Sequence, residues 1–247
     1  MINEVLHCVN DIDINNAWRE VMLLCIKEGH DFVVKGGSYV GQIRKQLASV
    51  KIEISEPWRR PLAPITPPPY PPPTSEEKIE TYFLEYIMSE TVHGKEFYTY
   101  GSYIFPQLQP AIDILIKAQG NTNQACISVG DRESIKMPDP PCLKVISFKV
   151  VDKKLVMSLF LRSWDLFCGL PENLAGLQYL KEYVLSSIED KIEVLDGPII
   201  AYSDGLHLYE QYFEIADAFN IEKIKINKKA LDDKDNFNKT LDLLDNS

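Results

Sequence analysis

Cys142 and Arg162 are spaced as a nucleophile and an activating charge would be. Cys142 follows two prolines at the start of a predicted strand, which fixes its backbone and limits the positions open to the thiol. A cysteine attacks as the thiolate, and a nearby guanidinium favours that form. Because Arg162 ends the second strand of a predicted hairpin, antiparallel pairing would bring it back beside Cys142. The two residues together predict covalent catalysis by a thiolate.

Hydrogen-bonding side chains in two later segments suit a polar ligand. Asn173 offers both a donor and an acceptor, which fits the polar edge of a nucleobase. His207 and Tyr209 stand two positions apart, so on a strand they face the same side. Taken singly, a cysteine at a strand start or a His-x-Tyr pair is more often part of a packed core. None of these residues alone decides a function.

Three predicted elements position these side chains. In residues 142–165, apolar and polar residues alternate on either side of a polar link at Asp152-Lys153-Lys154, which predicts a β-hairpin. Residues 174–188 carry apolar residues at helical spacing and predict an amphipathic helix. Residues 198–202 predict a further strand, shortly before the His-x-Tyr pair.

The rest of the chain mixes helical and strand patterns. Thr74-Ser75-Glu76-Glu77 is typical of a helix start, with a capping hydroxyl and acidic residues in the first turn. The other predicted elements are three helices and two strand-prone segments, over residues 18–25, 76–88, 110–117, 32–54 and 125–129. This order predicts one α+β domain over residues 1–247, with a mostly antiparallel or mixed sheet.

Two segments depart from this alternation. Residues 61–73 contain eight prolines and predict a stiff, extended polyproline II connector inside the domain. A role as a peptide ligand for another protein is the alternative, with less support. Residues 223–247 are rich in Lys, Asp and Asn with few apolar anchors, so we predict a weakly anchored tail.

The composition is that of an acidic globular protein. A formal charge of −10 and a pI near 5.0 argue against nucleic acid or an anionic membrane as a general partner. The five cysteines include no CxxC pair, so neither a zinc site nor a disulfide framework is predicted. The longest clean apolar run, residues 21–26, is too short to cross a membrane, and no signal peptide is evident. We expect a cytoplasmic protein with reduced thiols and no bound metal.

Taken together, the segments resemble one family. Pro-Pro before Cys142, then RS-x-D, GLP-x-N and HLY, follow the order and spacing of thymidylate synthases over roughly residues 100–212. The form SWDLFCGLPENLAGLQYLKEY, with GLHLY and RPLAP, resembles the archaeal branch. The resemblance implies a three-layer α+β fold with a large mixed β-sheet flanked by helices. It also implies a homodimer that associates back to back through the large sheet.

The resemblance further implies the reductive methylation of dUMP to dTMP. Cys142 would add to C6 of the pyrimidine, which makes C5 enolate-like. Arg162 would bind the phosphate and lower the pKa of the thiol, and Ser163 would add a hydrogen bond to the phosphate. Tyr100 would assist the water-mediated removal of the C5 proton. The one-carbon unit and the closing hydride would come from 5,10-methylene-tetrahydrofolate or a methanopterin-type analogue.

Four more residues acquire roles from the same resemblance. Asn173 would contact O4 and N3 of the uracil, while His207 and Tyr209 would hold the deoxyribose 3′-hydroxyl. Asp165 would hold the pterin ring.

The sequence departs from the family pattern at several points. Leu143 stands where the family usually has His after the catalytic cysteine. The paired arginines that reach the partner subunit's phosphate are replaced by Asn123 and Gln124, whose amides bind phosphate more weakly. The family's closing carboxy-terminal segment is not recognisable in LLDNS. The residues that could restore the missing positive charge are Lys35, Arg44, Arg59 and Arg60. An acidic residue that assists proton transfer is expected within 76–88, as either Glu80 or Glu85.

Two alternatives remain at this point. A pyrimidine-nucleotide hydroxymethylase shares the thiolate addition but ends with water instead of hydride. Asn173 favours uracil, because a carboxylate would suit the amino group of cytosine better. The missing arginine pair also motivates a non-catalytic nucleotide-binding relative.

Overall fold

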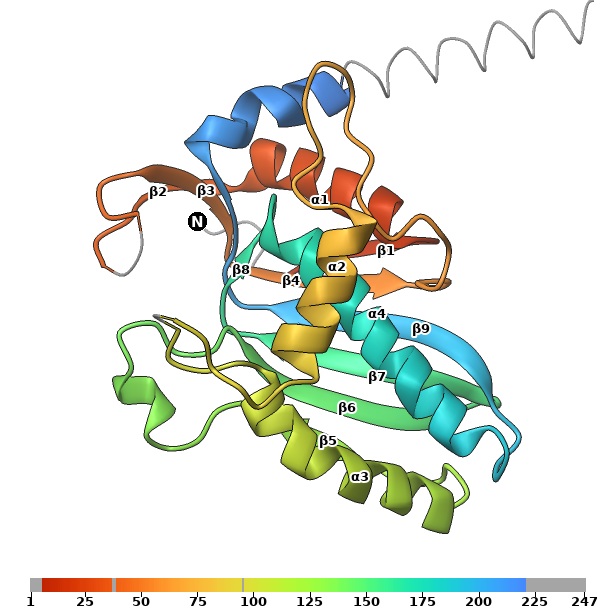
Figure 1. Cartoon of the computed structure of the whole chain (residues 1–247). Coiled ribbons are helices and arrows are strands. Elements are labelled where there is room, and N and C mark those ends of the chain that lie inside the picture. The colour runs from red at the N-terminus through yellow and green to blue at the C-terminus, as the bar shows by residue number, and fades with distance from the viewer. Residues whose placement is uncertain (1–5, 37–38, 95, 221–247) are drawn as a thin grey trace, which may run out of the picture.

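The computed structural model describes residues 6–36, 39–94 and 96–220, with the helices placed against a large central sheet (Figure 1). That sheet has six strands in the order β1-β4-β9-β7-β6-β5. Its strands are β1 (Leu6–Asp11), β4 (Ser49–Ile54), β5 (Cys126–Ser128), β6 (Leu143–Val151), β7 (Lys154–Leu161) and β9 (Leu195–Ser203). Pairings β1–β4 and β7–β9 are parallel and the other three antiparallel, so the predicted mixed sheet is confirmed.

A second sheet of four strands was not predicted. Its order is β2-β3-β10-β8. The strands are β2 (His30–Val33), β3 (Ile43–Leu47), β8 (Trp164–Asp165) and β10 (Leu206–Tyr209). β8 comprises two residues and β10 four, too short to show a periodic pattern. This small sheet nevertheless carries several of the predicted site residues.

The helices pack on one another as well as on the sheet. They are α1 (Ile14–Glu28), α2 (Glu76–Tyr82), the π-helical turn η1 (Phe83–Ile87), α3 (Gly101–Lys117) and α4 (Gly169–Ile188). Two short 3-10 turns are η2 (Ser134–Lys136) and η3 (Glu210–Tyr212). In Figure 1, α4 lies over β7 and β9, and α2 lies over α4. The arrangement has the predicted layers of sheet and helices.

Local signals explain where these helices begin. Asp13 accepts a hydrogen bond from the backbone N–H of Asn16 at the start of α1, and Ser75 accepts one from Lys78 at the start of α2. The second cap confirms the predicted start signal. The inner face of α1 buries Trp18 among other apolar residues at helical spacing.

The helix predicted over 110–117 is longer than its pattern suggested. It begins at Gly101 and contains Pro106 and Pro110 within its length. A proline inside a helix removes a backbone hydrogen bond and normally ends the helix. Here the buried apolar face of the helix, which includes Ile104 and Leu108, packs into the core and outweighs that local cost.

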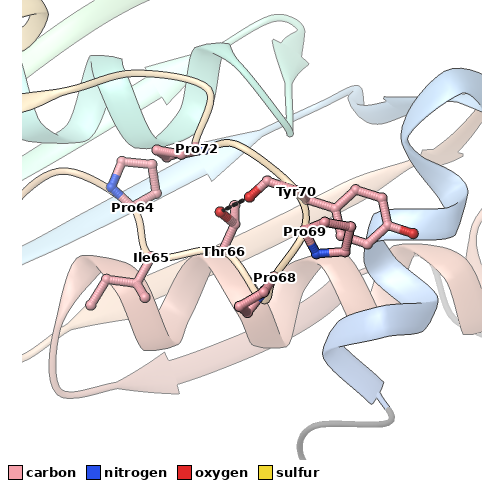
Figure 2. A pocket seen from close by; sticks show the side chains of 7 residues that line it. All are labelled: Pro64, Ile65, Thr66, Pro68, Pro69, Tyr70 and Pro72. Atoms are coloured by element: carbon pink, nitrogen blue, oxygen red, sulfur yellow. Dashed lines mark hydrogen bonds between the residues drawn. The ribbon is translucent and has the colours of Figure 1, made fainter.

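The proline-rich segment is tied to α1 and changes direction. Asn15 donates from Nδ2 to the carbonyl oxygen of Pro61 at 3.0 Å and accepts at Oδ1 from the N–H of Ile65 at 2.8 Å. The N–H of Tyr70 donates to the oxygen of Pro67 at 3.1 Å, and the hydroxyl of Thr66 donates to the oxygen of Tyr70 at 2.6 Å. Figure 2 shows this turn around a shallow cavity. The segment therefore bends instead of forming one straight rod. The predicted tail over 223–247 lies outside the described residues.

The predicted hairpin is confirmed as β6 and β7. Ile146 pairs with Leu159 and Phe148 with Met157 in an antiparallel register. At the open end of the hairpin, the N–H of Arg162 donates to the carbonyl oxygen of Cys142 at 2.9 Å. Strand pairing thus brings these two residues side by side.

Candidate active site

A cavity of about 440 Å³ lies at the junction of the two sheets. Its volume is within the range that small-molecule sites occupy. Six of the predicted site residues line it, which are Cys142, Arg162, Ser163, Asp165, His207 and Tyr209. The other lining residues are Val34, Gly36, Tyr39, Arg44, Pro138, Asp139 and Pro140. The chain therefore gathers a thiol, two guanidinium groups, two carboxylates and an imidazole at one place.

Arg162 holds the loop that leads to the nucleophile. Its Nε donates to the carbonyl oxygen of Pro141 at 3.2 Å, and its Nη2 donates to the oxygen of Pro140. The same Nη2 pairs with Asp139 Oδ1 at 3.3 Å. These contacts fix the backbone that immediately precedes Cys142. Arg162 thus holds this loop in place and also supplies a positive charge next to the thiol.

The protonation of Cys142 reflects opposed effects. Burial is the largest and raises the pKa of the thiol, while the charge of Arg162 lowers it. The charge of Asp139 raises it further. Arg162 therefore acts in the predicted direction, but in the ligand-free molecule burial outweighs it and the net pKa is raised.

His207 is neutral around physiological pH. Burial lowers the pKa of its imidazole from 6.5 to about 4, and the charges of Arg44 and Arg162 lower it as well. Its Nδ1 lies 2.9 Å from the carbonyl oxygen of Gly205, which requires the proton to sit on Nδ1. Nε2 is then an acceptor. Ser163 Oγ lies 3.4 Å from the same Nδ1 and so contacts the edge of the imidazole.

Asp165 connects the cavity to the start of α4. Its Oδ1 accepts from the N–H of Phe167 at 2.9 Å and from that of Cys168 at 3.1 Å. Burial raises the pKa of this carboxyl, and these backbone donors oppose the rise. The carboxyl is held rigidly at the cavity wall.

Among the four cationic candidates, Arg44 is the one that lines the cavity. Its guanidinium donates from Nη2 to Gln46 Oε1 at 2.8 Å and lies 4.7 Å from the ring centroid of Phe32. Its Nε is buried with no hydrogen-bond partner among the described residues. It also hydrogen-bonds Tyr209, which lowers the pKa of that phenol against the larger effect of burial. A buried donor without a partner is costly, so Arg44 is suited to an anionic ligand.

The other three cations face elsewhere. Arg59 pairs with Glu56, and Arg60 pairs with Glu182 at 2.9 Å. Lys35 is exposed and does not line the cavity, although its neighbours Val34 and Gly36 do. Sequence alone could not choose among the four, because the choice depends on how β3 packs.

Tyr100 and Asn173 lie beside the cavity without lining it. Tyr100 is 6% exposed, and its hydroxyl accepts a hydrogen bond from the N–H of Leu143 at 3.3 Å, next to the nucleophile. Burial, followed by the charge of Cys142, raises the pKa of this phenol. Asn173 is half-buried, and its amide hydrogen-bonds both Trp164 and Tyr82.

The structure does not bring four predicted residues to this cavity. Asn123 and Gln124 line a separate cavity of about 730 Å³ between the end of α3 and β6. Glu80 and Glu85 are exposed on the outer side of α2 and η1. The inner side carries tyrosines, so neither glutamate stands beside Cys142.

Sequence reasoning missed Asp139 and Tyr39. Asp139 stands immediately before Pro-Pro-Cys, which was a signal that could have been used. Tyr39 has a positive φ of 67° and packs 4.9 Å from the ring of Tyr209, and no sequence pattern announces either feature.

Two further findings apply to the described part of the chain. It contains no group of three or more His, Cys, Asp or Glu side chains placed to hold a metal ion. None of its helices has the length and apolar character needed to span a bilayer.

Comparison with known proteins agrees with the geometry. The family model for thymidylate synthase matches residues 81–239. A Methanosarcina mazei protein named "Putative thymidylate synthase" is 23% identical over 220 residues, which cover 87% of this chain and 94% of that protein. The thymidylate synthase of Listeria monocytogenes serotype 4a is 30% identical over 170 residues, which cover 64% of this chain and 52% of that protein.

A solved structure shares the fold. Thymidylate synthase A from Bacillus subtilis superposes with a TM-score of 0.61 at 14% identity, covering 84% of this chain and 83% of that one. The family model spans more than half of the chain, and the fold and the gathered site residues agree with it. The chain therefore belongs to the thymidylate synthase family, whose members are methyltransferases.

Proposed function

We propose that this protein catalyses the reductive methylation of dUMP to dTMP. The observation that carries the proposal is the shared cavity, in which Cys142 and Arg162 stand beside Ser163, His207 and Tyr209. A nucleotide bound there would place its base toward the thiol and its phosphate toward the guanidinium groups. The family assignment supports the same reaction.

Cys142 carries out the covalent step. Its sulfur adds to C6 of the uracil, and the C5–C6 electron pair moves to C5 and O4 to give an enolate. C5 would then form a bond to the methylene carbon that the carrier supplies when bound. Only after that bond exists does a water beside the Tyr100 hydroxyl take the C5 proton, and the electron pair of the C5–H bond stays on the ring as the enolate. Loss of the C6–S bond at the end returns the thiolate. Burial raises the pKa of the Cys142 thiol in the ligand-free protein. We therefore propose that Arg162 lowers this pKa most strongly once a bound nucleotide has ordered the site.

Arg44 and Arg162 form the phosphate cradle. Arg44 has a buried Nε without a partner in the described residues, and Arg162 and Ser163 line the same wall. Arg44 thus supplies within one chain a charge that Asn123 and Gln124 lack. Charge-assisted hydrogen bonds to phosphate are stronger than those from amides. His207, with Nε2 free to accept, and Tyr209 suit the 3′-hydroxyl of the sugar.

The co-substrate is a reduced pterin, either 5,10-methylene-tetrahydrofolate or a methanopterin-type carrier. When bound it supplies the methylene carbon and the closing hydride. Asp165 fits it, because a carboxyl held at the cavity wall can accept from the N–H groups of the ring. Turnover with each carrier in parallel distinguishes the two.

We also propose a cytoplasmic homodimer. Phe160 and Tyr202 are register partners on β7 and β9, and both are exposed on the large sheet. Exposed aromatic side chains on a sheet face suit association with a second copy. A monomeric mass by sedimentation would contradict this part of the proposal.

Tritium release tests the reaction directly. Wild-type protein should release tritium from C5-labelled dUMP in the presence of a methylene carrier and form dTMP. Cys142→Ser should lose turnover by orders of magnitude and still bind dUMP in calorimetry. Cys126→Ser is the matched control, since that thiol is exposed on β5 away from the cavity. Hydroxymethylated product, preference for dCMP, or indifference to Cys142→Ser would refute the proposal.

A further inference from the structure

The amide of Asn173 is held by two partners of different hydrogen-bonding character. Its Oδ1 accepts from Trp164 Nε1 at 2.9 Å, and its Nδ2 donates to the Tyr82 hydroxyl at 2.8 Å. An indole N–H can only donate, whereas a hydroxyl can donate or accept. The atom that faces Trp164 must therefore be the oxygen. Trp164 alone dictates the orientation, because Tyr82 would tolerate either one.

Tight packing holds all three groups. Trp164 is 2% exposed and lies in β8, Tyr82 ends α2, and Asn173 is the fifth residue of α4. Gly176, also on α4, makes room for the tyrosine ring, since an added Cβ would stand 2.7 Å from its Cδ1. The indole cannot turn away without disturbing the core. The arrangement is set before any ligand enters.

This amide adjoins the cavity wall. A Cβ built on Gly169 would lie 3.3 Å from Cβ of Asp165 and 3.7 Å from Asn173 Oδ1, so a single glycine separates the two side chains. Trp164 itself stands between Ser163 and Asp165 in the chain, and both of these line the cavity. The remaining hydrogen-bonding capacity of the amide is therefore close to the place of the base.

After its two protein bonds the amide keeps one N–H and one oxygen lone pair. Uracil presents an acceptor at O4 and a donor at N3, which match that pair. Cytosine presents the reverse, a donor at N4 and an acceptor at N3. To bind cytosine equally well the amide would have to rotate by half a turn, and its NH₂ would then face the indole N–H. Two buried donors facing each other are strongly unfavourable.

We infer that Trp164 selects uracil over cytosine nucleotides by fixing the orientation of the Asn173 amide. Trp164 is a positioning residue, since it acts through Asn173 and does not itself touch the base. The inference rests on the proposed function and adds to it the residue that determines base specificity.

The test compares affinities for dUMP and dCMP by calorimetry, in the Cys142→Ser background so that no turnover is needed. Trp164→Phe removes the indole donor, and 3-benzothienylalanine at position 164 removes it while keeping the shape of the ring system. In both, we expect the preference for dUMP to fall about tenfold to a hundredfold. Tyr82→Phe is the matched control and should weaken both nucleotides without changing their ratio.

An unchanged ratio in the benzothienylalanine protein would overturn the inference, even if Trp164→Phe failed to fold. So would an equal collapse of the ratio in Tyr82→Phe. Because the readout is binding, it is independent of the tritium-release result. If the Trp164 variants lost the preference for dUMP but the wild-type protein released no tritium, the reaction would be refuted and Trp164 would remain the selector.

Discussion

The neutral state of His207 makes a quantitative prediction about stability. Burial lowers the pKa of this imidazole from 6.5 to about 4. In the unfolded chain the group binds a proton below about pH 6.5, whereas in the folded chain it does so only near pH 4. The unfolded state thus binds more protons between these values. The contribution of His207 is fully present above 6.5 and is lost as the pH falls toward 4.

The magnitude follows from the two pKa values. Over the whole interval the lowered pKa corresponds to about 3 kcal/mol of unfolding free energy. The pI near 5.0 makes precipitation a concern at lower pH, so the useful window is narrower. Between about pH 7.5 and about pH 5.5, the imidazole of His207 takes up a proton in the unfolded chain but hardly at all in the folded chain. This contributes about 1.4 kcal/mol to the decrease in stability.

The variant for this test is His207→Asn. Its side-chain N–H can still donate to the carbonyl of Gly205, as Nδ1 does at 2.9 Å, but it cannot titrate. Urea unfolding followed by circular dichroism gives the free energy of unfolding of both proteins at each pH. We expect the wild type to lose about 1.4 kcal/mol more than the variant across the window. Parallel pH curves for the two proteins would refute a buried, neutral His207.

Two other predictions concern charges near the thiol and in the core. Asp139→Asn removes a charge that raises the pKa of Cys142, so alkylation of that thiol near pH 8 should become faster. Peptide mass spectrometry measures the rate of alkylation. An unchanged or slower rate would argue against an effect of the Asp139 charge on the thiol. Lys181 is fully buried and pairs with Asp196 at 2.8 Å, so Asp196→Ala should cost about 3 to 5 kcal/mol in urea unfolding. Lys153→Ala, at an exposed pair with Glu193, should change stability by less than about 1 kcal/mol, and equal losses in the two variants would contradict the argument.

Several features of the site could be predicted before the structure. The alternation on both sides of Asp152-Lys153-Lys154 predicted the hairpin, and its antiparallel register places Arg162 beside Cys142. The spacing of His207 and Tyr209 predicted a common face, and both side chains line the cavity. These inferences hold because they depend on neighbouring residues or on one tight strand pairing.

Other features depend on contacts that no local pattern encodes. Helix α3 continues through Pro106 and Pro110 because its apolar face is buried, a tertiary effect that overrides a local helix breaker. The small sheet joins strands from distant parts of the chain, and β8 has only two residues. Its pairing aligns His207 with Asp165 on one side and with Gln46 on the other.

The sequence by itself determined the reactive side chains and the hairpin that joins Cys142 to Arg162, because alternation and chain spacing are local properties. Only the tertiary structure decided that Arg44, and not Lys35, Arg59 or Arg60, lines the cavity, and that Trp164 points its N–H at Asn173. The physical reason is that a buried donor acts on whatever the packing places against it, and packing is a property of the whole core.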